Sequence, residues 1–190
     1  IGWTWANGPE IAHDGMRPER SSHKDILLVD RVEDAISRIN PGTPKEVIRK
    51  VRQMLESPGE TGVLKANQQI HQWMTEGMPV KVRDESGDET TNLLWLIDFQ
   101  NIENNDWLAV NQYSVQVDAD AGTRRPDIVL FLNGIPISVL ELKNPSDLDT
   151  DIWQAFEQLQ TYKAQISRLF YYNSVLMIAD GADARMGSLT

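Results

Sequence analysis

Apolar residues along the first 77 positions recur every three or four residues, which is the spacing of one face of an α-helix. This pattern predicts helices over residues 30–39, 44–56 and 64–76. Glycine follows each of them within three residues, as expected where a helix ends. The segment Thr43-Pro44-Lys45-Glu46 reads as a capping box with proline at the first helical position. Residues 1–24 predict no regular element, and residues 25–29 fit either a short strand or the approach to a helix.

From residue 78 the spacing changes to the alternation of β-strands. Strands are predicted over residues 78–83, 93–99, 108–117 and 175–179, on either side of Asn133-Gly134, and a helix over residues 148–167. This order predicts an α+β (mixed α/β) fold, with a central mixed β-sheet flanked by helices. We assign residues 1–77 to an N-terminal helical region and residues 78–190 to the core, and expect both to pack as one structural domain.

The two apolar, β-branched segments beside Asn133-Gly134 predict a β-hairpin, since this dipeptide favours a tight turn. If only these two residues form the turn, residue 132 pairs with residue 135. Asp127 then lies opposite Leu140, and Glu141 faces the other side of the sheet.

A three-residue turn over residues 132–134 gives another register, in which residue 131 pairs with residue 135. Asp127, Glu141 and Lys143 then share one face of the sheet. A type I turn with Gly134 as a left-handed G1 bulge produces this register, and we predict this bulged form.

Composition and charge narrow the class of protein. The chain has 190 residues, no cysteine and a formal net charge of −10, so disulfides, thiol catalysis and Cys-ligated zinc are excluded. The negative charge argues against a strong autonomous nucleic-acid binder. No apolar run has the length of a membrane span, and we expect a cytoplasmic protein without a membrane partner. The first residue is Ile rather than Met, so we expect a part of a longer protein.

The shared face predicts metal chemistry, because two carboxylates in apolar strands are costly to bury without a ligand. Mg²⁺ takes one or two carboxylates and completes its shell with water and substrate phosphate. Asp127, Glu141 and the backbone carbonyl of Leu142 are the predicted ligands. Lys143 could orient or deprotonate the attacking water, or neutralise developing charge. Together they predict phosphodiester hydrolysis, with no nucleophilic side chain required.

Other polar residues could support this site. Gln158 and Tyr162 lie one turn apart on the predicted helix and could hold a phosphate or a water molecule. Arg125, with Arg124 before it, could meet the DNA backbone. His13 and His23 lie in the irregular first segment without ligand-like spacing, and the sequence assigns no metal to them.

This combination resembles the PD-(D/E)xK nuclease superfamily, with Pro126-Asp127 and Glu141-Leu142-Lys143 as the motif. Gln158 and Tyr162 match the QxxxY motif of the RecB-like branch. Further segments fall in the order seen in the N-terminal domain of type I restriction enzyme R subunits (HsdR): Asn40-Pro41, Leu96-Ile97-Asp98, Asn111-Gln112, Asn133-Gly134-Ile-Pro136, Asn144-Pro145 and Asp180-Gly181.

The resemblance implies a restriction-endonuclease-like core that cuts double-stranded DNA with Mg²⁺. Its partners would be the methylase and specificity subunits of the restriction complex. ATP would bind elsewhere in the subunit, since this chain has no GxxxxGK[ST] loop. The family often carries a further acidic residue on a helix before Gly2-Trp3, where this chain begins; Glu19 is a weak candidate to replace it.

Two rival functions remain open. The same fold could serve as a non-catalytic docking module that joins the motor to its partner subunits, which the acidic composition favours. A glycosidase could use the two carboxylates, but it would not need Lys143.

Overall fold

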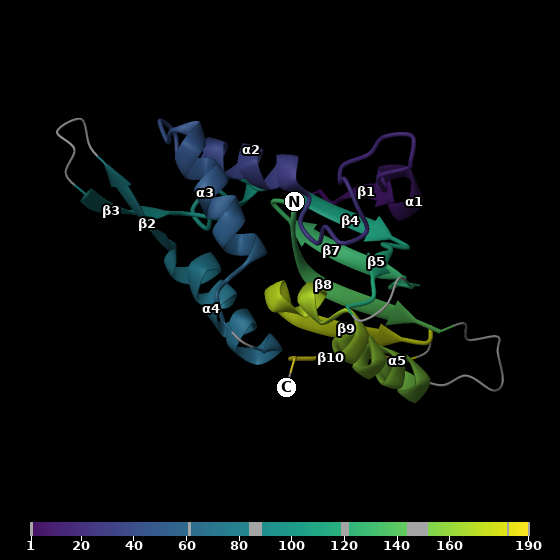
Figure 1. Ribbon diagram of the computed structural model, residues 1–190. Coiled ribbons are helices and arrows are strands. Elements are labelled where there is room, and N and C mark those ends of the chain that lie inside the picture. Colours follow the sequence, from purple (N-terminus) through teal and green to yellow (C-terminus); the bar gives the residue numbers. More distant parts are fainter. Residues whose placement is uncertain are drawn as a thin grey trace.

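A six-stranded sheet forms the centre of the protein in the computed structural model (Figure 1). The structure describes residues 2–60, 62–83, 89–118, 122–143, 152–181 and 183–189. The strands follow the order β1-β4-β7-β8-β9-β10. Their bounds are β1 Thr4–Asn7, β4 Trp107–Asn111, β7 Ile128–Leu132, β8 Ile135–Leu142, β9 Val175–Ala179 and β10 Ala184–Gly187.

The sheet is mixed. β1 runs parallel to β4, and β8 runs parallel to β9, whereas the other neighbours are antiparallel. Helix α5 (Ile152–Gln165) and the 3₁₀ helix η2 (Ser167–Tyr172) pack against the sheet. This arrangement confirms the predicted α+β fold with a central mixed sheet flanked by helices. The first part of the helix predicted over residues 148–167 lies outside the described residues.

Three helices of the first 77 residues form at the predicted places: α2 Val29–Ile39, α3 Lys45–Glu56 and α4 Val63–Glu76. Residues 25–28 lead into α2 rather than forming a strand. The predicted capping box is wrong: the N-cap of α3 is Pro44, one residue later, and no side chain caps it. At the other end of α4, Gly77 has a φ of 85°, which ends the helix as the sequence predicts.

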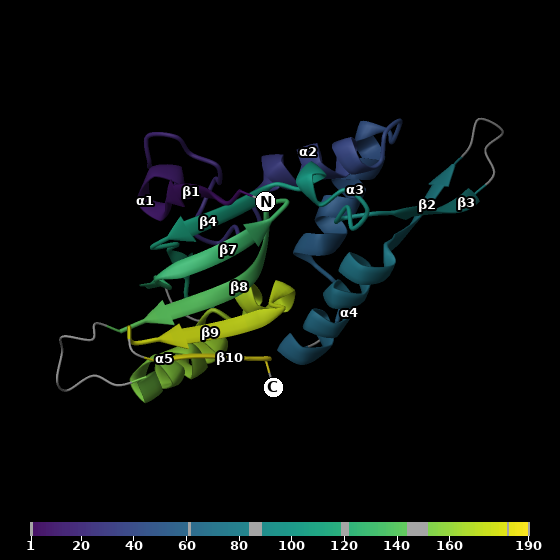
Figure 2. The ribbon, with the colours of Figure 1, turned by 180° about the vertical axis from the view of Figure 1, so that it is seen from behind.

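A separate hairpin projects from the helices (Figure 2). It joins β2 (Met78–Arg83) to β3 (Glu89–Leu94). The strand predicted over residues 93–99 is therefore wrong for most of its length, because β3 begins earlier and stops at Leu94. After that residue the chain leaves the hairpin, and the backbone N–H of Trp95 donates to the Asn40 side chain at 2.8 Å.

The first segment contains a strand and a short helix, α1 (Gly8–Ile11), where the sequence predicts no element. β1 is short, and Ala6 is its one buried residue, so it shows no alternation of apolar and polar positions. Its partner β4 lies about a hundred residues away, and only the tertiary fold supplies the pairing. The boundary at residue 77 stays a prediction, and the segment before it contributes one strand to the sheet.

The β7–β8 turn differs from the predicted bulged form. Leu132 pairs with Ile135, and both turn residues have positive φ, 54° for Asn133 and 78° for Gly134, as a type I′ turn requires. The turn packs against the start of α2, where a Cβ on Gly134 would lie 2.6 Å from the Leu28 carbonyl oxygen.

A bulge farther along β8 restores the shared face. Phe131 pairs with Pro136 and Leu130 with Ser138, so the bulge inserts Ile137. Beyond it Ile128 pairs with Leu140, and one more step places Asp127 opposite Glu141. The predicted turn was wrong, but the two carboxylates reach one face through a bulge at another position.

The remaining elements are short: the 3₁₀ helix η1 (Ile102–Asn104) and a two-stranded ladder of β5 (Val115–Gln116) with β6 (Thr123–Arg124). One core of apolar side chains joins the helices to the sheet. Across the described ranges, no helix has the length and apolar character needed to cross a membrane.

Candidate active site

The predicted site residues lie at the end of the sheet that is remote from α2, α3 and α4. Asp127 immediately precedes β7, and Glu141 and Lys143 lie at the end of β8. The opposite end of this hairpin is the Asn133-Gly134 turn, which contacts α2. Helix α5 lies beside the free end of β8, as Figure 1 shows. The hairpin thus supplies the acidic residues, and α5 adds polar side chains from the side.

Asp127 is held by hydrogen bonds to both of its carboxylate oxygens. Its Oδ2 accepts from the backbone N–H of Leu142 at 2.8 Å, and its Oδ1 accepts from Gln112 Nε2 at 3.3 Å. Its backbone carbonyl accepts from the N–H of Gln112 at 2.8 Å. These contacts fix the carboxylate against the end of β8 and orient it toward the face of Glu141.

Glu141 is an acid in an unfavourable position for a negative charge. Its side chain is almost wholly buried, with 2% of the residue exposed, and Oε2 has no hydrogen-bond partner among the described residues. Burial, followed by the nearby charge of Asp127, raises the pKa of Glu141 to about 7, and Lys143 opposes this rise. A buried carboxylate oxygen without a partner is costly, so this position suits an oxygen ligand of a cation.

Lys143 connects the carboxylates to α5. Its Nζ lies 3.6 Å from Glu141 Oε1 and donates to Gln158 Oε1 at 2.7 Å. Gln158 Nε2 in turn donates to the Tyr162 hydroxyl at 2.6 Å. Burial raises the pKa of Tyr162 to about 12, so this hydroxyl keeps its proton at neutral pH. The chain of contacts holds the ammonium group beside Glu141.

The structure brings together five of the predicted side chains: Asp127, Glu141, Lys143, Gln158 and Tyr162. Their catalytic and metal-binding roles stay predictions, as does the role of the Leu142 carbonyl.

Other predicted candidates have different surroundings. The side chain of Arg125 is exposed. Arg124 donates to the Gln165 side chain on α5. Glu19 is bound to Arg31 through two hydrogen bonds and does not replace a further acid of the site.

Sequence reasoning missed the part played by Gln112. This residue has a φ of 56°, a left-handed conformation that is uncommon outside glycine. The kink ends β4 and turns the side chain toward Asp127. Gly8 leaves room for this kink, because a Cβ at position 8 would lie only 2.3 Å from the Gln112 carbonyl oxygen. A signal was present: the apolar alternation predicted over residues 108–117 is interrupted by the polar pair Asn111-Gln112.

Three further motif residues lie away from the carboxylates and fix loops. The side-chain amide of Asn40 donates to the carbonyl of Trp95 and accepts from the backbone N–H of the same residue. Asp98 accepts from two backbone N–H groups and from the Asn104 side chain. Asn133 is buried and binds Leu96, Asn105 and Asp106. These hydrogen bonds, most of them to backbone groups, account for the three polar residues as supports of the loops, without a catalytic role.

Comparison with known proteins identifies the family of the chain. The family model for the N terminus of type I restriction enzyme R proteins matches residues 1–190. The chain is similar to the type I restriction enzyme HindI endonuclease subunit of Haemophilus influenzae, with 33% identity over 100% of this chain and 18% of that protein. It is also similar to the type I restriction enzyme SsaAORF53P endonuclease subunit of Staphylococcus saprophyticus, with 33% identity over 59% of this chain and 11% of the relative. Even the longer match spans less than a fifth of its relative's length. The chain therefore belongs to the HSDR_N family, the N-terminal region of type I restriction enzyme R proteins.

Proposed function

We propose that this chain is the Mg²⁺-dependent DNA endonuclease part of a type I restriction enzyme R subunit, with a PD-(D/E)xK site. One observation carries the proposal: Asp127 and the buried Glu141 share a face of adjacent strands, and Lys143 lies beside them. Burying one acid beside a second, partly buried acid and an ammonium group is costly unless they serve a site. The names of the relatives as endonuclease subunits support the same assignment.

The donor set fits magnesium. Glu141 Oε2 lacks a hydrogen-bond partner among the described residues, and the charge of Asp127 adds to the cost of ionising Glu141. A cation between the two carboxylates would remove both costs, and Mg²⁺ prefers such oxygen ligands. Asp127, Glu141 and the carbonyl of Leu142 would hold it. When bound, Mg²⁺ supplies a Lewis acid for phosphodiester hydrolysis.

Lys143 has two roles in this proposal: its ammonium group orients a water molecule or a phosphate oxygen, and it neutralises negative charge on the phosphate. A lysine ammonium has three N–H donors, and one of them is directed to Gln158. A second can face Glu141, which leaves one for a water molecule or a phosphate oxygen. Negative charge develops on the phosphate oxygens as the bond to the attacking water forms, and a fixed ammonium stabilises it. Gln158 and Tyr162 act as positioning residues that keep Nζ in place.

The substrate would be double-stranded DNA, delivered by other parts of the restriction complex. The net charge of −10 makes strong autonomous binding to phosphates unfavourable. Methylase and specificity subunits would supply recognition, and an ATP-driven translocase elsewhere in the R subunit would supply movement. The same charge also favours the rival function, a docking module without catalysis.

The experiment that separates these functions uses the assembled restriction complex. Asp127→Asn and Glu141→Gln are compared with Glu157→Gln, which makes the same chemical change at an exposed position of α5. We expect both site variants to slow DNA cleavage about a thousandfold, the factor given by losing roughly 4 kcal/mol of transition-state stabilisation. ATP hydrolysis should continue in all three. A docking module predicts that the site variants cut as fast as the control, and that result would refute the proposal.

A further inference from the structure

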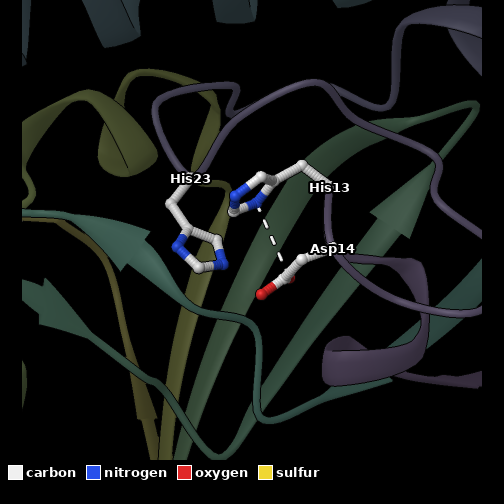
Figure 3. Close-up of side chains that lie close together, drawn as sticks. All are labelled: His13, Asp14 and His23. Carbon is white, nitrogen blue, oxygen red and sulfur yellow. Dashed lines mark ion pairs between the residues drawn. The ribbon is translucent and has the colours of Figure 1, made fainter.

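Three side chains of metal-ligand type meet in the loop between α1 and α2. His13, Asp14 and His23 each offer one nitrogen or oxygen atom, and these atoms all lie within 4.8 Å of one another. The two imidazole rings meet edge to face with centroids 4.8 Å apart. His13 Nδ1 lies 3.7 Å from Asp14 Oδ1. Figure 3 marks this ion pair with a dashed line and shows His23 beside it. Local sequence spacing gave no sign of this cluster, because the loop must fold back to bring His23 to His13.

We propose that His13, Asp14 and His23 form a second metal site, for a divalent transition-metal ion such as Zn²⁺. Two imidazoles and one carboxylate are zinc ligands, and water would complete the shell. A tetrahedral zinc with bonds of about 2.0 Å places its ligand atoms about 3.3 Å apart. The cluster needs a further inward movement of about an ångström. His13 and Asp14 are exposed, so rotation of their side chains can provide it.

The charges around the cluster are compatible with a cation. Asp14 supplies a negative charge beside His13. Metals bind the neutral form of an imidazole ring. Arg20 is the competing positive group, and it is held by the Ser114 carbonyl at 2.7 Å and by the Tyr113 ring at 4.0 Å.

A metal here would fix the loop near the proposed active site. The carbonyl of His23 accepts from the backbone N–H of Gln116 on β5 at 2.9 Å, and the carbonyl of Ser114 binds Arg20. Ser114 and Gln116 both follow β4 in the segment that begins at Gln112, and Gln112 donates to the Asp127 carboxylate. The ion would therefore tie residues 13–23 to the segment that positions one of the acids. This is a structural role, chemically distinct from an all-oxygen magnesium site.

The test is a calorimetric titration of Zn²⁺ into residues 1–190, which have their own hydrophobic core. Glu141→Gln is present throughout, so that the paired acids contribute little to binding. We expect one equivalent of zinc to bind. His13→Gln and His23→Gln should each weaken binding at least tenfold. His71→Gln is the matched control, since it removes an exposed histidine of α4 outside the cluster.

Thermal unfolding gives a second readout. Zinc at a hundredfold excess over its Kd should raise the Tm by about 5 to 10 °C, and EDTA should reverse the shift. The shift should vanish in the His13 and His23 variants and persist in the His71 variant, and Mg²⁺ should not reproduce it. If zinc fails to bind, or if the cluster variants bind it as tightly as the His71 variant, the proposed site is wrong.

Discussion

Replacing Glu141 by glutamine should stabilise the metal-free protein at alkaline pH, although the proposed function requires the same change to slow DNA cleavage. The pKa of Glu141 is raised from 4.5 to about 7, chiefly by burial. The folded state thus holds the proton more tightly than the unfolded state does. The stabilisation that this proton gives is complete below pH 4.5 and is lost as the pH rises through 7. The difference between the two pKa values corresponds to about 3 kcal/mol at most.

Glutamine keeps the shape of glutamic acid and has no charge to lose. At pH 8 and in EDTA, Glu141→Gln should unfold at a Tm up to about 6 to 12 °C above that of the wild type. Near pH 4 the two should unfold together. Melting curves from pH 4 to pH 8.5 measure this difference directly. Glu157→Gln, with its exposed side chain, should follow the wild type at every pH.

Magnesium should reduce the difference, because the proposed site would bind it in the ionised wild type and not in the variant. A Glu141→Gln variant that is less stable than the wild type at pH 8, or a stability difference that does not depend on pH, would contradict this prediction. Either result would mean that Lys143 stabilises the ionised Glu141 as a structural ion pair in the absence of a metal.

Three other predictions follow from the site and its supports. Lys143→Met should slow DNA cleavage by the full complex about 10²- to 10⁴-fold with little change in Tm; a structural ion pair would instead cost roughly 3–5 kcal/mol of stability, with cleavage lost only through unfolding. Gly8→Ala should lower stability by about 1–3 kcal/mol, since the new Cβ would lie 2.3 Å from the Gln112 carbonyl oxygen; Gly2→Ala, with no atom within 4 Å, should melt like the wild type. The isolated chain should bind DNA with a Kd of about a micromolar or weaker at physiological salt, and a gel shift at nanomolar protein would contradict this.

Much of the fold could be predicted because the signals are local. Helices α2, α3 and α4 bury one face each, and the apolar spacing shows that face directly. Strand β9 is an apolar run ended by Asp180-Gly181. By contrast, β1 has no pattern of its own and exists because it pairs with β4, which no local signal reveals.

The residues that meet at the candidate site were predictable from the sequence, and the register that brings them together was less so. Asp127, Glu141 and Lys143 could be named because acids and a lysine at the ends of two apolar segments are unusual. The turn alone could not settle the register of β7 and β8. The bulge at Ile137, which brings Asp127 and Glu141 to the same face, lies within an apolar run that looks the same in either register. Gln112 was missed because its role depends on a backbone kink beside Gly8.

The metal site is the part of the proposed function with the most direct test, which is whether Asp127 and Glu141 hold one divalent cation between them. Crystals of the protein soaked in Mn²⁺, a stand-in for Mg²⁺ with similar oxygen ligands, test it through the anomalous signal of manganese. We expect a manganese peak between these two carboxylates in the wild type and in Lys143→Met, and none in Glu141→Gln. Wild-type crystals without a peak between Asp127 and Glu141, or a peak that persists in Glu141→Gln, would contradict it.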